Sequence, residues 1–266
     1  MSEDRLDPLS AFGLAGQRII ITGASGALGR IIALALSELG ARQLLVSGSA
    51  DSLQGVADEA RARGGEIHTL ARRPDDEAGV EEIFDAAVSL LGGVDSVFVA
   101  SGFNQPDAIE KMTLEQWETI MDANVRSPWL IARAFGRHAE QRGGGGRLVL
   151  VSSVRGRFGS PAGYSAYSTS KGAIDALTRT LATEWGPRGI NVNAIAPTVF
   201  RSALTGWIFS DTEAGRASRE RNLSRIPKKR LGEPEDFVGP VVFLLSAASD
   251  FVTGQILYVD GGYSAA

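Results

Sequence analysis

The sequence contains no cysteine and only two histidines, His68 and His138. Without cysteine, disulfides, thiolate nucleophiles, iron–sulfur clusters and zinc sites built on thiolates are excluded. Two histidines far apart along the chain leave almost no material for a histidine-based catalytic triad or a multi-histidine metal site. We therefore expect no metal centre, and any acid–base chemistry must use other side chains.

The chain also lacks an excess of positive charge and a long apolar run. Its 27 Lys and Arg residues against 31 Asp and Glu residues give a formal net charge of −4. No global field therefore attracts nucleic acid or an acidic membrane surface. The chain has no run of about 18 apolar residues, and residues 1–17 lack the pattern of a secretory signal. We expect a cytoplasmic protein that binds neither nucleic acid nor membrane.

The composition otherwise suits a single large folded domain. Of the 266 residues, 44% are hydrophobic, and 32 glycines are scattered without a three-residue period. This amount of apolar material can form a core, and the glycines indicate many tight turns.

Short β-branched or apolar runs alternate with amphipathic helical stretches along most of the chain. The runs expected to form strands are 18–22, 44–47, 66–70, 96–100, 148–152, 190–195 and 256–259. Parallel strands need crossovers of a dozen or more residues, so this alternation predicts an α/β fold: one Rossmann-type doubly wound parallel sheet of about seven strands with helices on both faces. We expect residues 1–17 to form a polar leader and 18–266 to form one domain. Residues 202–228 are the only long interruption, and we expect a substrate lid there.

A glycine-rich turn, TGASGALG, runs from Thr22 to Gly29 between the first expected strand and the helix after it. At such a junction, backbone N–H groups and the helix dipole can hold a pyrophosphate, and glycine allows its close approach. The alternative is a tight turn without a ligand.

Tyr167 and Lys171 lie four residues apart in YSTSK, at the start of a helical segment. Their side chains therefore share one helix face. A lysine ammonium near a tyrosine stabilises the phenolate and draws its pKa from about 10 towards neutrality. The pair could then exchange a proton near pH 7. An ordinary surface pair is the alternative, because a motif this short is common.

The order of these motifs carries a resemblance. The glycine-rich turn is followed by SSVRG at residues 152–156, by YSTSKGAIDALTRTLATEWGPRGINVNAIAP and by a closing RLGEPEDFVGPVVFLLSAASDFVTGQILYVDGGY. Across residues 18–263 the chain resembles the short-chain dehydrogenase/reductase family. The resemblance implies a dinucleotide-binding and catalytic domain, and an NAD(P)-dependent oxidoreductase that interconverts a secondary alcohol and a ketone.

The resemblance also implies four catalytic residues. Tyr167 would be the general acid/base, Lys171 would lower its pKa and hold the nicotinamide ribose, and Ser153 would hydrogen-bond the substrate oxygen. Ser152 is the alternative, because the spacing to Tyr167 is one residue longer than in many relatives. Asn124 would hold a water that feeds protons to the lysine. Pro128 has no N–H to donate to the Asn124 carbonyl, which leaves that carbonyl free to accept.

The resemblance implies that the cofactor contacts residues near the ends of most strands. The expected contacts are Gly23, Ser25, Gly26, Leu28, Gly29, Ser47, Ala100, Gly102, Tyr167, Lys171, Pro197 and Ser202. The chain departs from the family pattern at Ala27, at Ala100 and at Arg73, where an aspartate commonly meets the adenine. The second strand ends in Ser47, Gly48 and Ser49, with no carboxylate to reject NADP and no arginine to bind it unless Arg72 or Arg73 reaches across. This favours NADP weakly over NAD.

The expected partners are a small alcohol or ketone and further copies of the chain, as a homotetramer or homodimer. Arg155 and Arg157 could attract an anionic end of the substrate, although solvated or internally paired arginines are the simpler interpretation. Trp207 to Phe209 suggest an apolar substrate body if they face inward. The alternative function is a dinucleotide-binding sensor or structural subunit without turnover.

Overall fold

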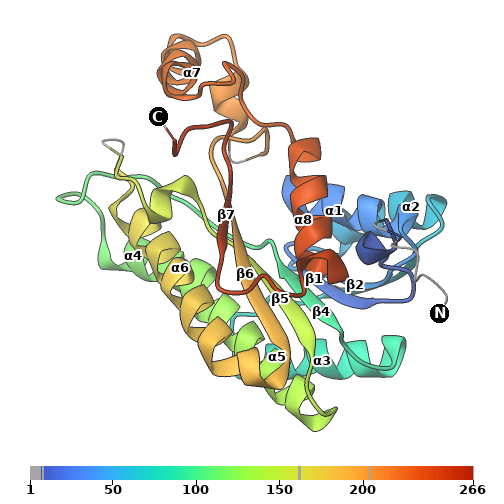
Figure 1. Ribbon diagram of the computed structural model, residues 1–266. Coiled ribbons are helices and arrows are strands. Elements are labelled where there is room, and N and C mark those ends of the chain that lie inside the picture. Colours follow the sequence, from blue (N-terminus) through green and yellow to red (C-terminus); the bar gives the residue numbers. More distant parts are fainter. Residues whose placement is uncertain (1–6, 8, 161–162, 204, 266) are drawn as a thin grey trace.

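The computed structural model describes residues 7, 9–160, 163–203 and 205–265. Within these residues seven parallel strands form one sheet in the order β3-β2-β1-β4-β5-β6-β7 (Figure 1). The strands are β1 Arg18–Thr22, β2 Arg42–Ser47, β3 Glu66–Ala71, β4 Ser96–Val99, β5 Gly146–Val151, β6 Ile190–Pro197 and β7 Ile256–Val259. The predicted doubly wound parallel sheet is confirmed.

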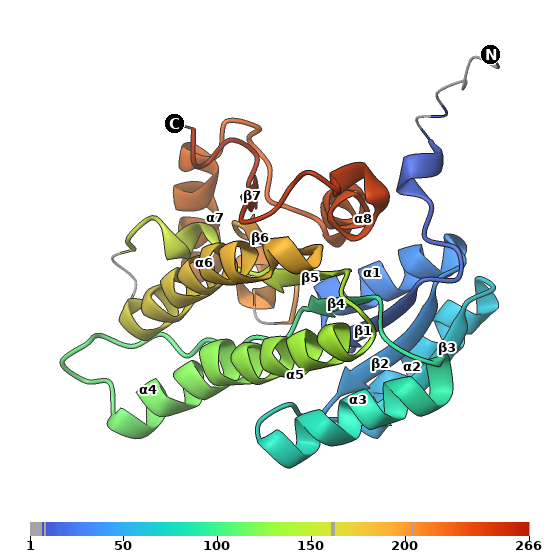
Figure 2. The ribbon, with the colours of Figure 1, turned by 60° about the horizontal axis from the view of Figure 1, so that its bottom comes forward.

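Helices cover both faces of the sheet (Figure 2). The described α-helices are α1 Ala27–Glu38, α2 Ala50–Ala62, α3 Glu77–Leu91, α4 Leu114–Met121, α5 Ser127–Gln141, α6 Ser165–Trp185, α7 Glu213–Arg225 and α8 Val238–Leu245. Residues of α3, α5 and α6 pack into one apolar cluster, and residues of α1, α2 and α8 pack into a second. Among the described residues, no helix is long and apolar enough to cross a membrane.

The central strand β1 shows why a strand that is covered on both faces has a continuous apolar sequence. Ile20 belongs to the cluster beneath α3, whereas Ile19 and Ile21 belong to the cluster beneath α1, and all three are fully buried. Successive side chains on a strand point to opposite faces, so a strand covered on both sides is apolar at every position.

The amino ends of the strands are held together by charged side chains. Asp95, just before β4, accepts hydrogen bonds from the backbone N–H of Arg18 at 3.0 Å and from its Nε at 2.8 Å. Arg142 donates to the same carboxylate at 2.6 Å, and Arg42 pairs with Glu66 at 2.7 Å. Partial burial raises the pKa of Asp95, but the bonds from Arg18 and then Arg142 outweigh it and hold that pKa well below its usual range.

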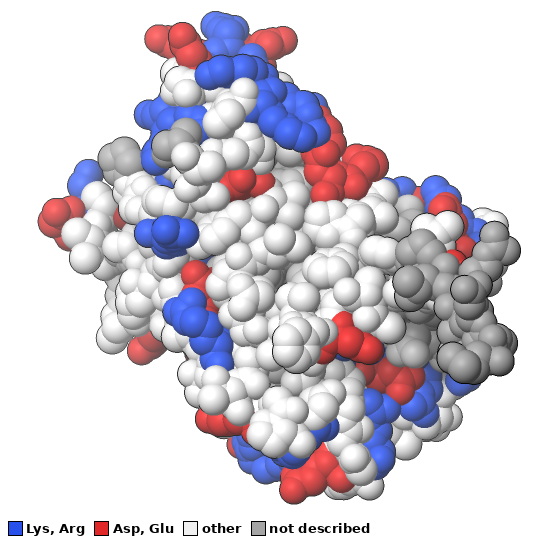
Figure 3. Space-filling model, viewed as in Figure 1, with Lys and Arg blue, Asp and Glu red and all other residues white. Residues whose placement is uncertain are grey.

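Residues 202–228, the expected lid, contain a 3₁₀ turn at Gly206–Phe209 and the helix α7. Ile208 is buried in a small apolar cluster, but Trp207 is 49% exposed, so the run does not face inward as a unit. Helix α7 projects from the body of the molecule, and Lys and Arg side chains gather at that end of the surface (Figure 3). Of the expected leader, residues 1–6 and 8 lie outside the described part, while Leu14 is buried in the core.

Candidate active site

The glycine-rich turn follows β1 at the carboxyl edge of the sheet. Gly23 has a φ of +69°, and a Cβ there would lie 2.5 Å from the backbone N of Ser101. A Cβ at Gly29 would lie 2.3 Å from the carbonyl oxygen of Gly23. Both positions therefore require glycine, and α1 begins directly after its N-cap, Gly26. This cradle without side chains at a helix N-terminus fits the pyrophosphate of a dinucleotide.

Other expected cofactor residues lie along the same edge. Ser25 and Ser47 share a hydrogen bond of 2.6 Å, which ties the glycine-rich turn to the end of β2. The Ala100 N–H donates to the Thr22 carbonyl at 3.0 Å. Leu28 is partly buried on the first turn of α1.

The end of β4 has a brace that the sequence analysis missed. The hydroxyls of Thr22 and Ser101 lie 3.3 Å apart, across the ends of β1 and β4. Ser101 thus links two strands where many relatives have an asparagine run. The hydroxyl of Ser101, in the stretch VASG at residues 99–102, was the signal in the sequence that could have indicated this contact.

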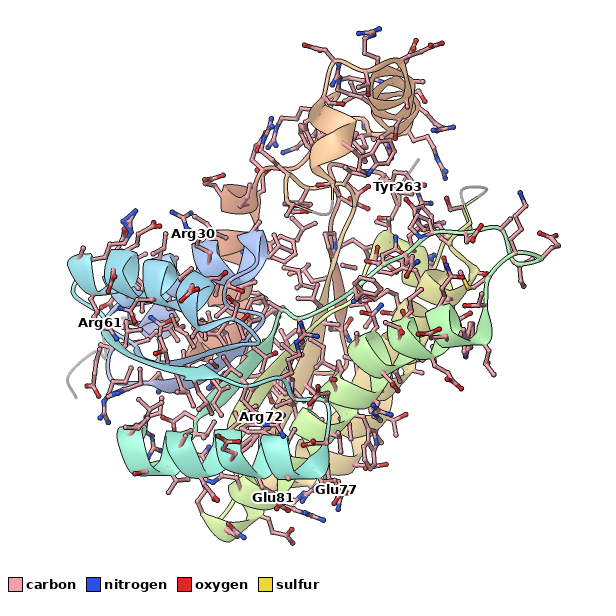
Figure 4. The ribbon with its side chains drawn as sticks, turned by 180° about the vertical axis from the view of Figure 1, so that it is seen from behind. Arg30, Arg61, Arg72, Glu77, Glu81 and Tyr263 are labelled. Atoms are coloured by element: carbon pink, nitrogen blue, oxygen red, sulfur yellow. The ribbon has the colours of Figure 1, made fainter. Side chains whose placement is uncertain are left out.

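Arg72 and Arg73, after β3, differ in their surroundings. Arg72 forms ion pairs with Asp76 at 2.7 Å, with Glu82 at 3.2 Å and with Asp75 at 3.4 Å, and it lies over α3 (Figure 4). Arg73 reaches the end of β2 instead: a Cβ at Gly48 would lie 2.5 Å from its Nε and 2.9 Å from its Cγ. In the described part of the chain, Arg73 forms no ion pair or hydrogen bond.

Asn124 lies in a π-helical turn, Asp122–Arg126, between α4 and α5. Pro128, four residues further on, cannot donate to the Asn124 carbonyl, and the chain forms this wider turn between the two α-helices. The Asn124 Oδ1 accepts from the Phe103 N–H at 2.7 Å, and its Nδ2 donates to Ser170 Oγ at 3.0 Å. Its side chain therefore joins the segment after β4 to α6. Gly102 lies beside it, since a Cβ there would be 3.4 Å from Asn124 Oδ1.

The two serines after β5 point in different directions. Ser152 donates to the Asp175 carboxylate at 2.5 Å. Ser153 hydrogen-bonds Tyr167, and its Oγ lies 3.4 Å from the carbonyl oxygen of Pro197. Of the two candidates, the structure brings Ser153 to the tyrosine.

Tyr167 and Lys171 lie one turn apart on α6, with the Lys171 Nζ 5.6 Å from the centroid of the Tyr167 ring. Burial raises the pKa of Tyr167, and the opposing groups are the Ser153 hydroxyl and the Arg155 charge. The prediction that Lys171 draws this pKa towards neutrality is therefore wrong for this structure. The Lys171 Nζ donates to the Val151 carbonyl at 2.7 Å.

Lys171 is itself strongly perturbed. Burial lowers its pKa to about 8, and the negative charge of Asp175 acts in the opposite direction. Burial also raises the pKa of Asp175, while the hydrogen bond from Ser152 opposes the shift. Sequence reasoning missed Asp175, although its spacing of four residues from Lys171 places it on the same face of α6.

The last two expected cofactor residues lie at and beyond the end of β6. Pro197 is its final residue. Ser202 is engaged in a turn, where its N–H and its hydroxyl each lie 3.0 Å from the Thr205 hydroxyl oxygen. Both lie where the chain leaves the carboxyl edge of the sheet.

Comparison with known proteins agrees with this arrangement. Residues 23–264 match the family described as enoyl-(acyl carrier protein) reductase. An uncharacterized oxidoreductase of Mycobacterium tuberculosis is 50% identical over 257 residues, covering 97% of this chain and 94% of that protein. Gluconate 5-dehydrogenase of Gluconobacter oxydans is 33% identical over 251 residues, covering 94% and 96%.

A solved structure assigned as a 2-deoxy-D-gluconate 3-dehydrogenase of Agrobacterium tumefaciens, with bound NADP, has a TM-score of 0.88 at 32% identity and covers 96% of this chain and 99% of its own. The fold, the cradle and these relatives define an NAD(P)-binding oxidoreductase. The chain belongs to the short-chain dehydrogenase/reductase family, and it is an enzyme.

Proposed function

We propose that this enzyme interconverts a secondary alcohol and a ketone, with Tyr167 as the general acid/base. One observation carries the proposal: Ser153, Tyr167 and Lys171 meet at the carboxyl edge of the sheet that also holds the glycine cradle. The names of the relatives support it, since gluconate 5-dehydrogenase acts on a hydroxyl-bearing acid.

Each residue has a distinct task in the ketone-reducing direction. A bound nicotinamide supplies the hydride, or accepts it in the reverse reaction. Ser153 donates a hydrogen bond to the substrate oxygen, and Tyr167 delivers a proton from its Oη to the developing alkoxide. Lys171, with a pKa of about 8, is mostly protonated at pH 7 and places a positive charge beside the phenol. Asn124 positions α6 through Ser170.

The raised pKa of Tyr167 gives the two directions opposite pH dependence. As a proton donor Tyr167 must be protonated, so ketone reduction should persist through neutral pH and fall as the solution approaches the tyrosine pKa. As a proton acceptor it must be ionised, so alcohol oxidation should increase with pH over the same range. Rates measured in both directions from pH 6 to 10 test this.

The decisive experiment is a panel of ketones and secondary alcohols assayed with NADPH, NADH and their oxidised forms, together with calorimetric binding of each nucleotide. Turnover of a secondary alcohol or its ketone supports the proposal. Nucleotide binding without turnover across the panel would instead favour a sensor or structural subunit.

We also propose a preference for NADP, with Arg73 as its determinant. The end of β2 has no carboxylate to repel a 2′-phosphate, and the Arg73 side chain packs on Gly48 with no ion pair among the described residues. An arginine is well suited to a phosphate because its fork of donors makes charge-assisted hydrogen bonds. NADP bound to a relative of 32% identity is consistent with this.

Arg73→Ala tests the assignment through binding. We expect the Kd for NADPH to rise about 10- to 100-fold, as for a lost charged hydrogen bond, with the Kd for NADH nearly unchanged. Arg72→Ala is the matched control, because three carboxylates already occupy that arginine, and it should leave the ratio of the two constants unchanged. An equal loss for both nucleotides in Arg73→Ala would contradict the preference.

We further propose that the enzyme is a homotetramer or homodimer in the cytoplasm. Trp129 of α5 is 46% exposed, and Leu114 at the start of α4 is 70% exposed. A hollow between α5 and α6 is lined by Trp129, Leu181 and Trp185. A second copy would cover these apolar groups. Sedimentation at micromolar concentration tests the assembly, and a single 28.1 kDa species would contradict it.

A further inference from the structure

Arg155 stands two residues after Ser153, in the short turn Val154–Gly156. Its backbone N–H donates to the Ser153 Oγ at 3.2 Å. Its Nη1 donates to the Gly159 carbonyl at 3.0 Å and lies 3.1 Å from the Tyr263 hydroxyl. The guanidinium is thus held in a defined position next to the proposed catalytic serine.

Aromatic rings flank this guanidinium. The Arg155 Cζ lies 5.6 Å from the ring centroid of Tyr263 and 5.8 Å from that of Tyr164. Tyr263 is only 3% exposed and also contacts Arg225 of α7, whose Cζ is 4.4 Å from the ring centroid. Figure 4 shows Tyr263 between α7 and the start of α6. The C-terminal segment therefore helps to fix Arg155.

No carboxylate among the described residues neutralises the positive charge of Arg155. In the part that the structure describes, Arg155, Arg157 and Arg225 form no ion pair with a carboxylate, although Arg155 is partly buried. A guanidinium has five N–H donors, and the two on Nη1 face Gly159 and Tyr263. The N–H groups of Nε and Nη2 donate to no described residue. They form the side of the fork that binds a carboxylate with two parallel hydrogen bonds.

The same charge acts on the proposed catalytic tyrosine. Arg155 is a cation that lowers the pKa of Tyr167, against the larger effect of burial. The Tyr164 ring neighbours both residues, with its centroid 5.8 Å from the Arg155 Cζ and 6.1 Å from the Tyr167 ring centroid. Arg155 is therefore near enough to Tyr167 for one small molecule to meet both.

We propose that Arg155 is a binding residue for a carboxylate of the substrate, so that the enzyme acts on small hydroxy or oxo acids. This inference rests on the proposed function, because it places the reacting carbon at Ser153 and Tyr167. Partly burying an arginine without a counter-charge costs free energy, and an anionic ligand would offset that cost. Arg157 does not share this role: it is exposed, packs on Phe158 and hydrogen-bonds Tyr258.

The test compares acids with neutral molecules of the same length. The probes are aldonates of four to six carbons, including gluconate, and the polyols of matching length, including glucitol, with oxidised NADP or NAD as hydride acceptor. We expect Arg155→Ala to lower the ratio of kcat/KM for acid over polyol about 10- to 100-fold, as for a lost hydrogen bond to a charged group. Arg155→Lys keeps the charge but loses the fork, so it should fall between Arg155→Ala and the unsubstituted enzyme.

A matched variant guards against a general disturbance of the turn. Arg157→Ala removes the neighbouring exposed guanidinium and keeps Arg155 with its contacts. It should keep the acid-to-polyol ratio within about twofold, well below the loss expected for a charged hydrogen bond. If Arg155→Ala slows both substrate classes equally and moves the pH profile, Arg155 acts only by positioning or polarising Tyr167, and the carboxylate site is overturned.

Calorimetric titration of the nucleotide-loaded enzyme with the aldonates gives a readout that needs no turnover. Turnover of neutral alcohols without any aldonate binding would overturn the inference and leave the proposed function intact. Aldonate binding that is lost in Arg155→Ala, without turnover of any alcohol or ketone, would uphold the site and overturn the proposed function. Aldonate binding and turnover that both survive Arg155→Ala would overturn the carboxylate site alone.

Discussion

The two ends of the parallel sheet use the same charged residue types in opposite ways. At the amino ends, Arg18 and Arg142 share the Asp95 carboxylate, and Arg42 pairs with Glu66. At the carboxyl ends, neither Arg73 nor Arg155 has a carboxylate partner within the described residues. The amino edge uses ion pairs to join strands, whereas at the carboxyl edge Arg73 and Arg155 keep their charges available, unlike Arg72, which pairs with carboxylates around the start of α3.

Burial sharpens the contrast. Lys171 is 3% exposed and its pKa is lowered to about 8, so the fold holds an ammonium that would be more stable in water. Such a buried charge reduces stability, and perturbed groups of this kind cluster at functional sites. We infer that substitutions at the amino edge mainly affect unfolding, and that those at the carboxyl edge mainly affect turnover and binding.

Among these changes, we expect Tyr167→Phe to separate an effect on turnover from an effect on unfolding most strongly. The change removes one hydroxyl and keeps the ring, so we expect kcat to fall by about 10³-fold or more, equivalent to about 4 kcal/mol. Nucleotide affinity and the free energy of unfolding should be nearly unchanged. Steady-state kinetics, calorimetry and urea unfolding measure the three quantities. A variant that retains most of its kcat would eliminate Tyr167 as the proton donor.

Asp95→Asn is the corresponding change at the amino edge. It leaves Arg18 and Arg142 without a counter-charge, and we expect a loss of about 2–4 kcal/mol in unfolding free energy at pH 7, with little change in kcat per folded molecule. The pKa of Asp95 is lowered by folding, so its stabilisation is complete above the unfolded pKa of about 4 and is lost as the pH falls below that value.

Urea unfolding of the two proteins between pH 7 and pH 3 checks both the size and the sign of the Asp95 effect. The difference between them should shrink as the solution becomes more acidic. Glu66→Gln is the control, because the Arg42–Glu66 pair is more exposed and should contribute much less. A difference that grows at low pH would contradict the assignment.

Ser153→Ala and Ser152→Ala separate two neighbouring hydroxyls. Loss of the Ser153 donor should lower kcat about 100-fold, in the range for one oxyanion-type hydrogen bond. Ser152→Ala removes a bond to the buried Asp175 and should act on stability instead. Steady-state kinetics and urea unfolding of both variants distinguish the two roles, and the reverse pattern would assign the catalytic role to Ser152.

The sequence predicted the fold because its signals are local. Strand runs, helical spacing and the glycine-rich turn set the seven strands and their order of appearance, and YSTSK placed Tyr167 and Lys171 on one helix face. The fates of individual polar groups depend on tertiary contacts instead. Ser152 and Ser153 are adjacent and of one type, and they are distinguished by their tertiary partners, Asp175 for Ser152 and Tyr167 for Ser153.

The same limit explains the error on the tyrosine pKa. Spacing brought Lys171 near Tyr167, but the size of desolvation depends on everything packed around the ring. The adjacent arginines Arg72 and Arg73 show the same limit. Arg72 forms ion pairs with the carboxylates around the start of α3, whereas the Arg73 side chain packs on Gly48.

We expect the smallest effect at the hydroxyl pair of Thr22 and Ser101, which combines a structural role with a position at the carboxyl edge. Their 3.3 Å contact is structural in kind but lies at the carboxyl edge, next to the glycine cradle. Thr22→Val and Ser101→Ala should each cost about 0.5–1.5 kcal/mol of unfolding free energy, as for one neutral hydrogen bond. In the double variant the loss of unfolding free energy should fall short of the sum of the two single losses, because both changes remove the same bond.

Nucleotide affinity of these variants, measured by calorimetry, should stay within about twofold, far below the effect of a charged contact. Losses that simply add would show that the two hydroxyls do not interact, and a large loss of affinity would assign the pair to cofactor binding rather than to bracing the strands.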